Sequence, residues 1–172
     1  AVRKIAALEA LSRPHGVDAG ELESFTIQPN LWPTSAVIDW YLILRRSDKL
    51  PRRAERLASA EQILRSRLNL QGTMMGFSTE RTDDWWSLMA SADSNANRLL
   101  LAMADNPAWR DDMGRLTRGA LGRQRAGRWG TTVANAWGVL ALDRFAQKFE
   151  SQKVTGTVSA TLGQASKSIA FG

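Results

Sequence analysis

The sequence predicts a mainly α-helical protein built of helical hairpins, with a short β-hairpin at its C-terminal end. Two patterns predict this fold class. Apolar residues recur at intervals of three and four over most of residues 1–151, which is the spacing of amphipathic helices. Between Val154 and Leu162, apolar or small residues instead alternate with Thr and Ser, which is the period of a β-strand.

The amino-acid composition excludes several kinds of catalytic and metal-binding site. The 172 residues include no Cys, a single His and a net charge of +6. The lack of Cys excludes disulfides, thiolate metal ligands and Cys nucleophiles, and one His excludes a His-rich metal site. No phosphate-loop, nucleotide-fingerprint or zinc spacing occurs, so we expect no metal or other cofactor. The apolar runs are shorter than the roughly 18 residues that a membrane span requires.

Six segments have helical spacing, and they cover residues 1–12, 34–46, 51–68, 84–105, 107–122 and 131–151. In the first, Arg3, Lys4 and Glu9 are expected on the polar back of the helix. Pro14 and Gly16 then end it, which leaves His15 in a surface turn. The second segment is apolar nearly all round, which is typical of a helix buried between others. The third is amphipathic and should lie outside the second.

The remaining segments complete the chain. Residues 69–82 have no helical period and predict a loop or a short hairpin. Thr82 or Asp83 is the expected N-cap of the helix over 84–105. Gly114 and Gly119 weaken the prediction of a helix over 107–122. Residues 163–166 are expected to turn the C-terminal strand into a second one, from Lys167 to Phe171.

The helices follow a repeat in which an apolar helix alternates with an amphipathic one. Two apolar members share a start, Trp32-Pro33-Thr34-Ser35 and Trp129-Gly130-Thr131-Thr132. The run Ser91–Ala96 resembles Thr131–Ala136, and it places Asn95 where the other has Asn135. Units of about 40 residues suit helical hairpins, which stack as an open solenoid or close into an α/α toroid.

In a toroid, the starts of the inner helices would gather around one end, and the Trp residues would pack the seams between helices. We therefore expect no catalytic residue here but a set of structural anchors: Trp32, Thr34, Trp86, Asn95, Trp129, Thr132, Asn135 and Trp137. As a core residue, Trp137 should cost about 3–5 kcal/mol of stability when replaced by Ala.

Two alternatives remain open. Toroid enzymes place carboxylates at the ends of inner helices, so Asp83 and Asp84 could serve a hydrolase or a cyclase. Adjacent Asp residues at a helix start are, however, commonly a cap and a partner of the helix dipole. The pair Asp111 and Asp112 is a weaker candidate for the same role.

The second alternative is a basic helical-repeat module that binds nucleic acid through Arg115 to Arg128. Arg123, Arg125 and Arg128 form the densest basic cluster, and Trp129 beside them could stack a base. A solvated helix end explains the same residues, and the basic residues are otherwise spread over the chain. We therefore expect no nucleic-acid partner.

Two segments resemble bacterial α2-macroglobulins. They are Gln28–Leu44, QPNLWPTSAVIDWYLIL, and Arg128–Phe145, RWGTTVANAWGVLALDRF. In that family a Trp-x-x-Thr start followed by Asn-Ala-Trp and an Ala-Leu run marks a late helix of the thioester-type domain. The tail VTGTVSATLGQAS resembles the entry into the macroglobulin-like β domain that follows.

The resemblance implies that residues 1–151 are the later part of the toroid and that residues 152–172 are the first strands of the next domain. The chain begins at Ala1 within a helical pattern, so we expect a segment of a larger parent. The parent would be periplasmic, with any lipid anchor elsewhere in it. It would cage proteases that cut its bait region, and its partners would be those proteases, its own neighbouring domains and a penicillin-binding protein.

The sequence departs from the family at its reactive feature. It has no Cys and therefore no Cys-x-Glu-Gln thioester motif. No catalytic residue can be carried over from the family, and we expect this segment not to be an enzyme. Its expected role is structural and interactive.

Overall fold

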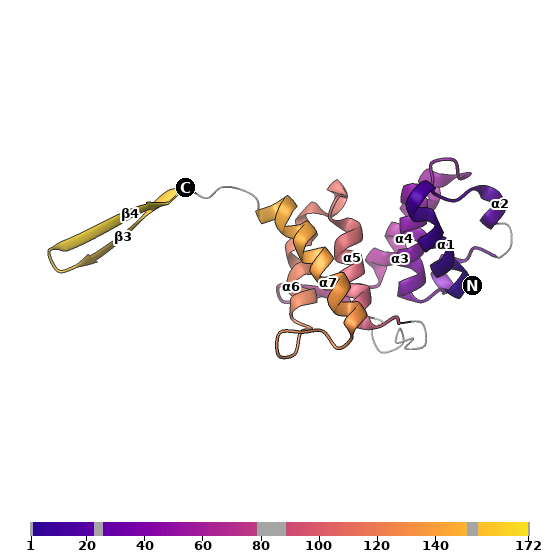
Figure 1. The fold of residues 1–172 in the computed structure, drawn as a ribbon. Helices are drawn as coiled ribbons and strands as arrows, with labels where there is room; N and C mark the ends of the chain where they lie inside the picture. The colour runs from indigo at the N-terminus through magenta and orange to yellow at the C-terminus, as the bar shows by residue number, and fades with distance from the viewer. Residues whose placement is uncertain (1, 23–25, 79–88, 151–154, 172) are drawn as a thin grey trace.

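The structure is a computed structural model that describes residues 2–22, 26–78, 89–150 and 155–171 (Figure 1). Its elements follow in the order α1 (Val2–His15), α2 (Ala19–Leu22), a 3₁₀ turn (Pro29–Leu31), α3 (Thr34–Arg46), α4 (Arg53–Ser66), β1 (Leu68–Gln71), β2 (Met74–Phe77), α5 (Ala92–Met103), a second 3₁₀ segment (Pro107–Asp112), α6 (Met113–Leu121), α7 (Thr132–Phe145), a π-helical turn (Ala146–Glu150), β3 (Gly156–Leu162) and β4 (Ala165–Phe171). The prediction of a mainly helical chain with a terminal β-hairpin is confirmed. The toroid stays a prediction.

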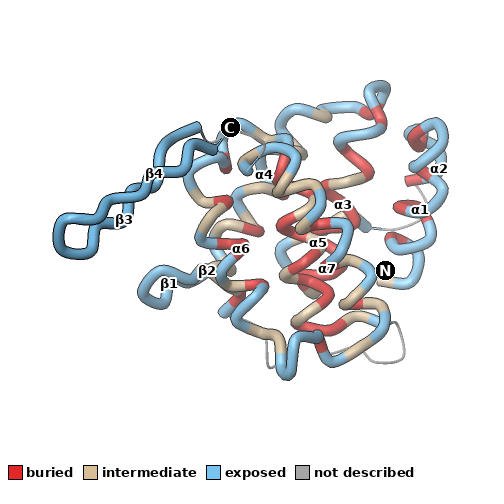
Figure 2. The backbone as a smooth tube through the Cα atoms, turned by 60° about the vertical axis from the view of Figure 1, so that its left-hand side comes forward, coloured by how far each residue is buried: buried red, intermediate tan, exposed pale blue. Residues whose placement is uncertain are grey.

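Helix α3 is the centre of the N-terminal half. Its side chains are buried nearly all round, with Trp40, Tyr41 and Ile43 among the most enclosed. It packs against both α1 and α4, as expected for a helix without a polar face. Figure 2 shows its buried backbone beside the mostly exposed turns of α1 and α2.

Helices α5 and α7 form the C-terminal half together with α6. The buried face of α7 consists of the small residues Ala134, Gly138 and Ala141, which lets neighbouring groups approach its backbone closely. The side-chain amide of Asn97 on α5 donates to the carbonyl oxygen of Ala134 at 2.9 Å. The two helices are therefore joined by a buried hydrogen bond as well as by packing.

Polar contacts join the two halves across one continuous core. The indole Nε1 of Trp109 donates to Glu61 Oε1 at 2.6 Å, and the Arg65 guanidinium lies over the Trp109 ring at 3.7 Å from its centroid. Asn106 donates to the hydroxyl of Tyr41 at 3.2 Å. These contacts fix the 3₁₀ segment that precedes α6 against α3 and α4.

The predicted hairpin over 69–82 is present as β1 and β2, which pair in antiparallel register. Strand β2 packs on α6 at Gly119. A Cβ atom at this position would overlap the carbonyl group of Met75. The glycine that weakened the helix prediction is therefore the residue that admits the strand.

The helix predicted over 84–105 begins later than expected, so the prediction of Thr82 or Asp83 as its cap is wrong. Met89 lies in the left-handed region with φ 55°, and Ser91 is the N-cap of α5. The hydroxyl of Ser91 accepts from the Ser94 backbone at 3.2 Å, and the Ser94 hydroxyl accepts from the Ser91 backbone at 2.8 Å. This reciprocal capping fixes the helix start at Ser91, well inside the range predicted for the helix. Asp83, Asp84 and Trp86 lie outside the described residues.

The C-terminal hairpin extends away from the helices (Figure 1). Strands β3 and β4 pair with Val158 opposite Ile169 and Ser159 opposite Ser168, and every described residue of both strands is exposed. One face carries Val158, Ile169 and their apolar neighbours, together with Lys167 opposite Ala160. The other carries hydroxyl groups, and those of Ser159 and Ser168 lie 2.6 Å apart. The first face is therefore mainly apolar and the second carries mainly hydroxyl groups.

None of the described helices is long and apolar enough to cross a membrane.

Candidate functional site

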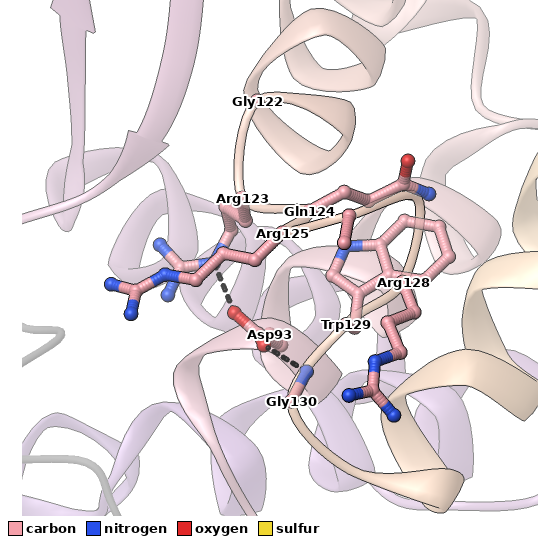
Figure 3. A pocket seen from close by; sticks show the side chains of 9 residues that line it. Asp93, Gly122, Arg123, Gln124, Arg125, Arg128, Trp129 and Gly130 are labelled. Atoms are coloured by element: carbon pink, nitrogen blue, oxygen red, sulfur yellow. Dashed lines mark hydrogen bonds and ion pairs between the residues drawn. The ribbon is translucent and has the colours of Figure 1, made fainter.

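The loop from α6 to α7 encloses a pocket of about 690 Å³, which we call the loop pocket (Figure 3). Its lining residues are Asp93, Gly122, Arg123, Gln124, Arg125, Ala126, Arg128, Trp129 and Gly130. The structure thus brings the three arginines of the predicted basic cluster to one place, together with a single carboxylate from α5. The excess of positive charge makes the pocket a candidate site for an anion.

A tight turn positions two of these arginines. The backbone NH of Arg125 donates to the Arg128 carbonyl at 2.8 Å, and the NH of Arg128 donates back to the Arg125 carbonyl at 3.3 Å. Between them, Ala126 and Gly127 both have positive φ, 52° and 75°, as in the primed turns of two-residue hairpins. The positive φ of Ala126 is strained for a residue with a side chain.

Asp93 fastens the loop to the start of α5. Its Oδ1 accepts from Nε of Arg123 at 2.7 Å, and its Oδ2 accepts from the backbone NH of Gly130 at 3.0 Å. Asp93 lies in the first turn of α5, where a negative charge also favours the helix dipole. In Figure 3 the side chains of Arg123 and Arg125 run together on one side of Asp93, whereas Arg128 points away on the other.

Trp129 is sealed beneath this loop. It is 4% exposed, its Nε1 donates to the Ala120 carbonyl at 2.9 Å, and its ring covers Gly138, where a Cβ atom would overlap it. Asn135 holds the backbone around it, because its amide donates to the carbonyls of Trp129 at 2.9 Å and Thr131 at 2.7 Å. Neither face of the indole is open, so Trp129 cannot stack a base in this arrangement.

The starts of α5 and α7 are geometrically equivalent, as the sequence repeat predicts. Ser91 and Thr131 are the N-caps, and each hydroxyl accepts from the backbone NH three residues later. Asn95 and Asn135 each donate their backbone NH to the carbonyl of the cap residue, at 2.9 and 3.0 Å. Their side chains differ: Asn135 closes the loop, whereas the buried Oδ1 of Asn95 has no partner among the described residues.

The start of α3 follows the repeat with a shift of one residue. Pro33 is its N-cap and Thr34 its first residue, whereas Thr131 caps α7 and Thr132 is the exposed first residue. Trp32 is buried and meets Trp40 edge to face at 6.2 Å between ring centroids. Pro33 carries no capping hydroxyl and makes no side-chain cap hydrogen bond. Arg67 joins this start to the end of α4 instead, since it donates to the Thr34 hydroxyl at 3.1 Å and to the Trp32 carbonyl at 2.7 Å.

Trp137 occupies a different place from the other described tryptophans of the anchor set. It is partly exposed and lines a groove of about 330 Å³, which we call the Trp137 groove. The other lining residues are Leu42, Arg45, Arg46, Arg98, Leu101, Ala102 and Asp105, from α3, α5 and the turn after α5. The guanidinium groups of Arg98 and Arg13 lie 5.4 and 5.9 Å from the centre of the indole ring, within the range of cation–π attraction.

A buried ionic cluster adjoins this groove, and the sequence did not indicate it. Glu9 was expected on the polar back of α1, but it is 3% exposed, and this prediction is wrong. Its carboxylate accepts from Arg46 at 2.6 Å and from Arg13 at 2.8 Å, which provides the charge that burial requires. Burial raises the pKa of Glu9, but these two hydrogen bonds outweigh burial and hold the pKa below its ordinary value.

Asp39 is the second carboxylate of the cluster. It is buried on α3 and paired with Arg98 of α5. Burial raises the pKa of Asp39 above its ordinary value, and the charge of Arg98 offsets only part of that effect. The signal in the sequence was a single Asp in the apolar run of residues 36–44, since a charge in such a run needs a buried partner.

The other described candidates, His15 and Asp112, lie on different elements. His15 is exposed at the last residue of α1 rather than in the turn that follows. Asp112 accepts from Arg65 at 2.8 Å, so it joins the segment before α6 to α4. Within the described ranges, no three His, Asp or Glu side chains gather as a metal site.

The chain matches no protein-family model, no curated protein and no solved structure.

Proposed function

We propose that this chain is a structural and interaction segment of a bacterial α2-macroglobulin-like protease trap, within the helical toroid of a larger periplasmic protein. The observation that carries the proposal is the equivalent start of α5 and α7, with the same cap geometry and Asn at the same position. A repeated capped start is what a stack of helical hairpins requires, since each unit must present the same end to its neighbours.

The distribution of polar groups supports a role without catalysis. The carboxylates Glu9, Asp39, Asp93 and Asp112 each bind an arginine of another element, so they stabilise the fold. The loop pocket and the Trp137 groove are each lined by three arginines and a single carboxylate, which suits contact with another macromolecule better than acid–base chemistry. The apolar face of the β3–β4 hairpin is suited to packing against further strands.

The test uses the full-length parent protein. It is mixed with a protease of broad specificity, and the protease is then assayed on a large protein and on a small peptide. Caging predicts that hydrolysis of the protein is lost while hydrolysis of the peptide persists. If both activities persist, the trap proposal is wrong.

A double variant separates the trap from the enzyme alternative. In the parent, Asp83→Asn with Asp84→Asn should leave caging unchanged if those residues have no catalytic role. Loss of caging with an intact fold, as judged by circular dichroism and a denaturant melt, would contradict the structural role proposed here.

A further inference from the structure

The Trp137 groove is lined by both apolar and basic residues. Leu42, Leu101 and Ala102 contribute apolar lining, and Trp137 forms a wall from α7. Arg45, Arg46 and Arg98 line the same groove against one carboxylate, Asp105. Such a combination is typical of a surface that binds an amphipathic segment, with apolar contacts at the centre and charges around them.

The balance of charge around the groove is positive even when its internal ion pairs are counted. Among the described residues, the carboxylates that face it or hold its arginines are Glu9, Asp39 and Asp105. The cations are Arg13, Arg45, Arg46, Arg98, Arg144 and Lys148. Because the cations outnumber the carboxylates, the groove attracts a negatively charged partner and repels a basic one.

Helix α7 extends this surface along its own axis. Trp137, Leu140 and Arg144 are spaced at i, i+3 and i+7, so they share one face of the helix over about 10 Å. Leu140 is 53% exposed, and Arg144 donates to Asp105 at 2.7 Å at the far end of the groove. The apolar strip is therefore about two helical turns long and ends in a cluster of charge.

We propose that the Trp137 groove is a docking site for an acidic amphipathic helix of a partner protein, which places its apolar side chains on Trp137, Leu101 and Leu140 and its carboxylates toward the arginines. Tryptophan and arginine are the residue types most enriched among those that dominate binding energy at protein interfaces. A helix fits the groove because apolar side chains on one of its faces repeat at the spacing of the strip.

Charge complementarity selects this occupant over a second copy of the chain. On α4, Glu55 is paired with Arg52, and Glu61 binds Trp109 and lies near Arg65. On α1, Glu9 is buried. Neither helix can therefore present an acidic apolar face to the groove of another copy. This inference does not depend on the proposed trap, because it concerns a surface of the chain alone.

The test uses the chain and a fluorescent acidic peptide patterned with Glu, Ala and Leu as an amphipathic helix. Anisotropy should show saturable binding, and peptide circular dichroism should show helix formation on binding. Trp137→Ala and Arg45→Glu should each weaken the affinity at least about tenfold, and Trp137→Phe should restore part of it. In a spectrum that resolves the indole NH signals, the signal of Trp137 should shift on binding.

Matched controls lie on the same molecule. Val139→Ser changes an exposed apolar residue of α7 off the groove-facing strip, and Arg125→Glu reverses a charge at the loop pocket. Both should leave the affinity unchanged. A denaturant melt of each variant distinguishes lost binding from lost folding.

Several outcomes would overturn the proposal. One is equal affinity for polyglutamate without an apolar face, which would make the attraction electrostatic alone. Another is binding that survives both Trp137→Ala and Arg45→Glu in folded protein. Preference for a single-stranded oligonucleotide, lost with Arg125→Glu, would place the anion site at the loop pocket instead. Concentration-dependent self-association that is abolished by Trp137→Ala would assign the groove to a second copy.

Discussion

The loop pocket and the Trp137 groove both contain arginines and a tryptophan, but they differ in how far the tryptophan is enclosed by the fold. At the loop pocket, Asp93 binds Arg123 and the Gly130 backbone, and Trp129 is sealed against Gly138. At the Trp137 groove, the aromatic ring remains partly exposed between arginines. One sequence motif, spanning 129–137, thus supplies one tryptophan to the core and one to the surface. Whether an aromatic residue is structural depends on the group opposite it, not on the motif.

The two tryptophans give the largest expected contrast. Trp129→Ala should lower the free energy of unfolding by about 3–5 kcal/mol, because it removes a fully enclosed ring and its hydrogen bond. Trp137→Ala should cost about 1–2 kcal/mol, because part of its ring already contacts water. This smaller cost replaces the cost of about 3–5 kcal/mol that the sequence predicted for Trp137 as a core residue. Denaturant melts of the two variants measure the contrast, and equal costs would contradict it.

Gly138, which lies against the Trp129 ring, gives the next largest expected change in stability. Gly138→Ala should destabilise the protein by about 1–3 kcal/mol, although alanine is the better helix former, because its methyl group overlaps the indole ring. Gly114→Ala on α6 is the control, since a Cβ there meets only the flexible end of Arg118. A stabilising effect of Gly138→Ala would mean that the ring is free to move.

Removing the Asp93 contact tests how firmly the loop is held. Asp93→Asn should cost about 1 kcal/mol, because the amide keeps an acceptor for Gly130 but loses the ion pair with Arg123, which is partly exposed to solvent. Hydrogen exchange at Gly130 should rise in the variant. Unchanged exchange would indicate that Asn135 alone holds the loop.

The loss of stability at acidic pH tests the ionic cluster beside the Trp137 groove. The pKa of Glu9 is lowered on folding, so its stabilising contribution is present above its unfolded pKa and is lost as the pH falls below about 4. The raised pKa of Asp39 acts in the opposite direction, since its contribution is present in acid and is lost as the pH rises through the folded value.

Glu9→Gln should therefore flatten the loss of stability in acid, and Asp39→Asn should steepen it. The check is a series of denaturant melts between about pH 3 and 6. A steeper acid limb in Glu9→Gln would contradict this assignment.

Reasoning from the sequence correctly predicted the elements whose residue spacing lies within one segment of the chain. The apolar run of α3, the amphipathic α4 and the alternation in β3 were each predicted from spacing, and the repeat correctly aligned Asn95 with Asn135. It failed where the deciding partner is distant in the chain. Glu9 is buried because Arg46 reaches it from α3, and Gly119 is needed because β2 packs on it. The start of α5 was misplaced because Ser91 and Ser94 cap each other.

The edges of the β3–β4 hairpin, unlike its two faces, bear on how the purified chain behaves. Within the described residues, β3 and β4 pair only with each other, so each has a free edge with unpaired backbone NH and carbonyl groups. Such edges are templates for any extended chain, and seven-residue strands are long enough to add a third strand. The shelf life of the purified chain should therefore depend on its concentration rather than on its melting temperature. A charge introduced at an edge position, such as Thr157→Lys, is the direct way to extend it.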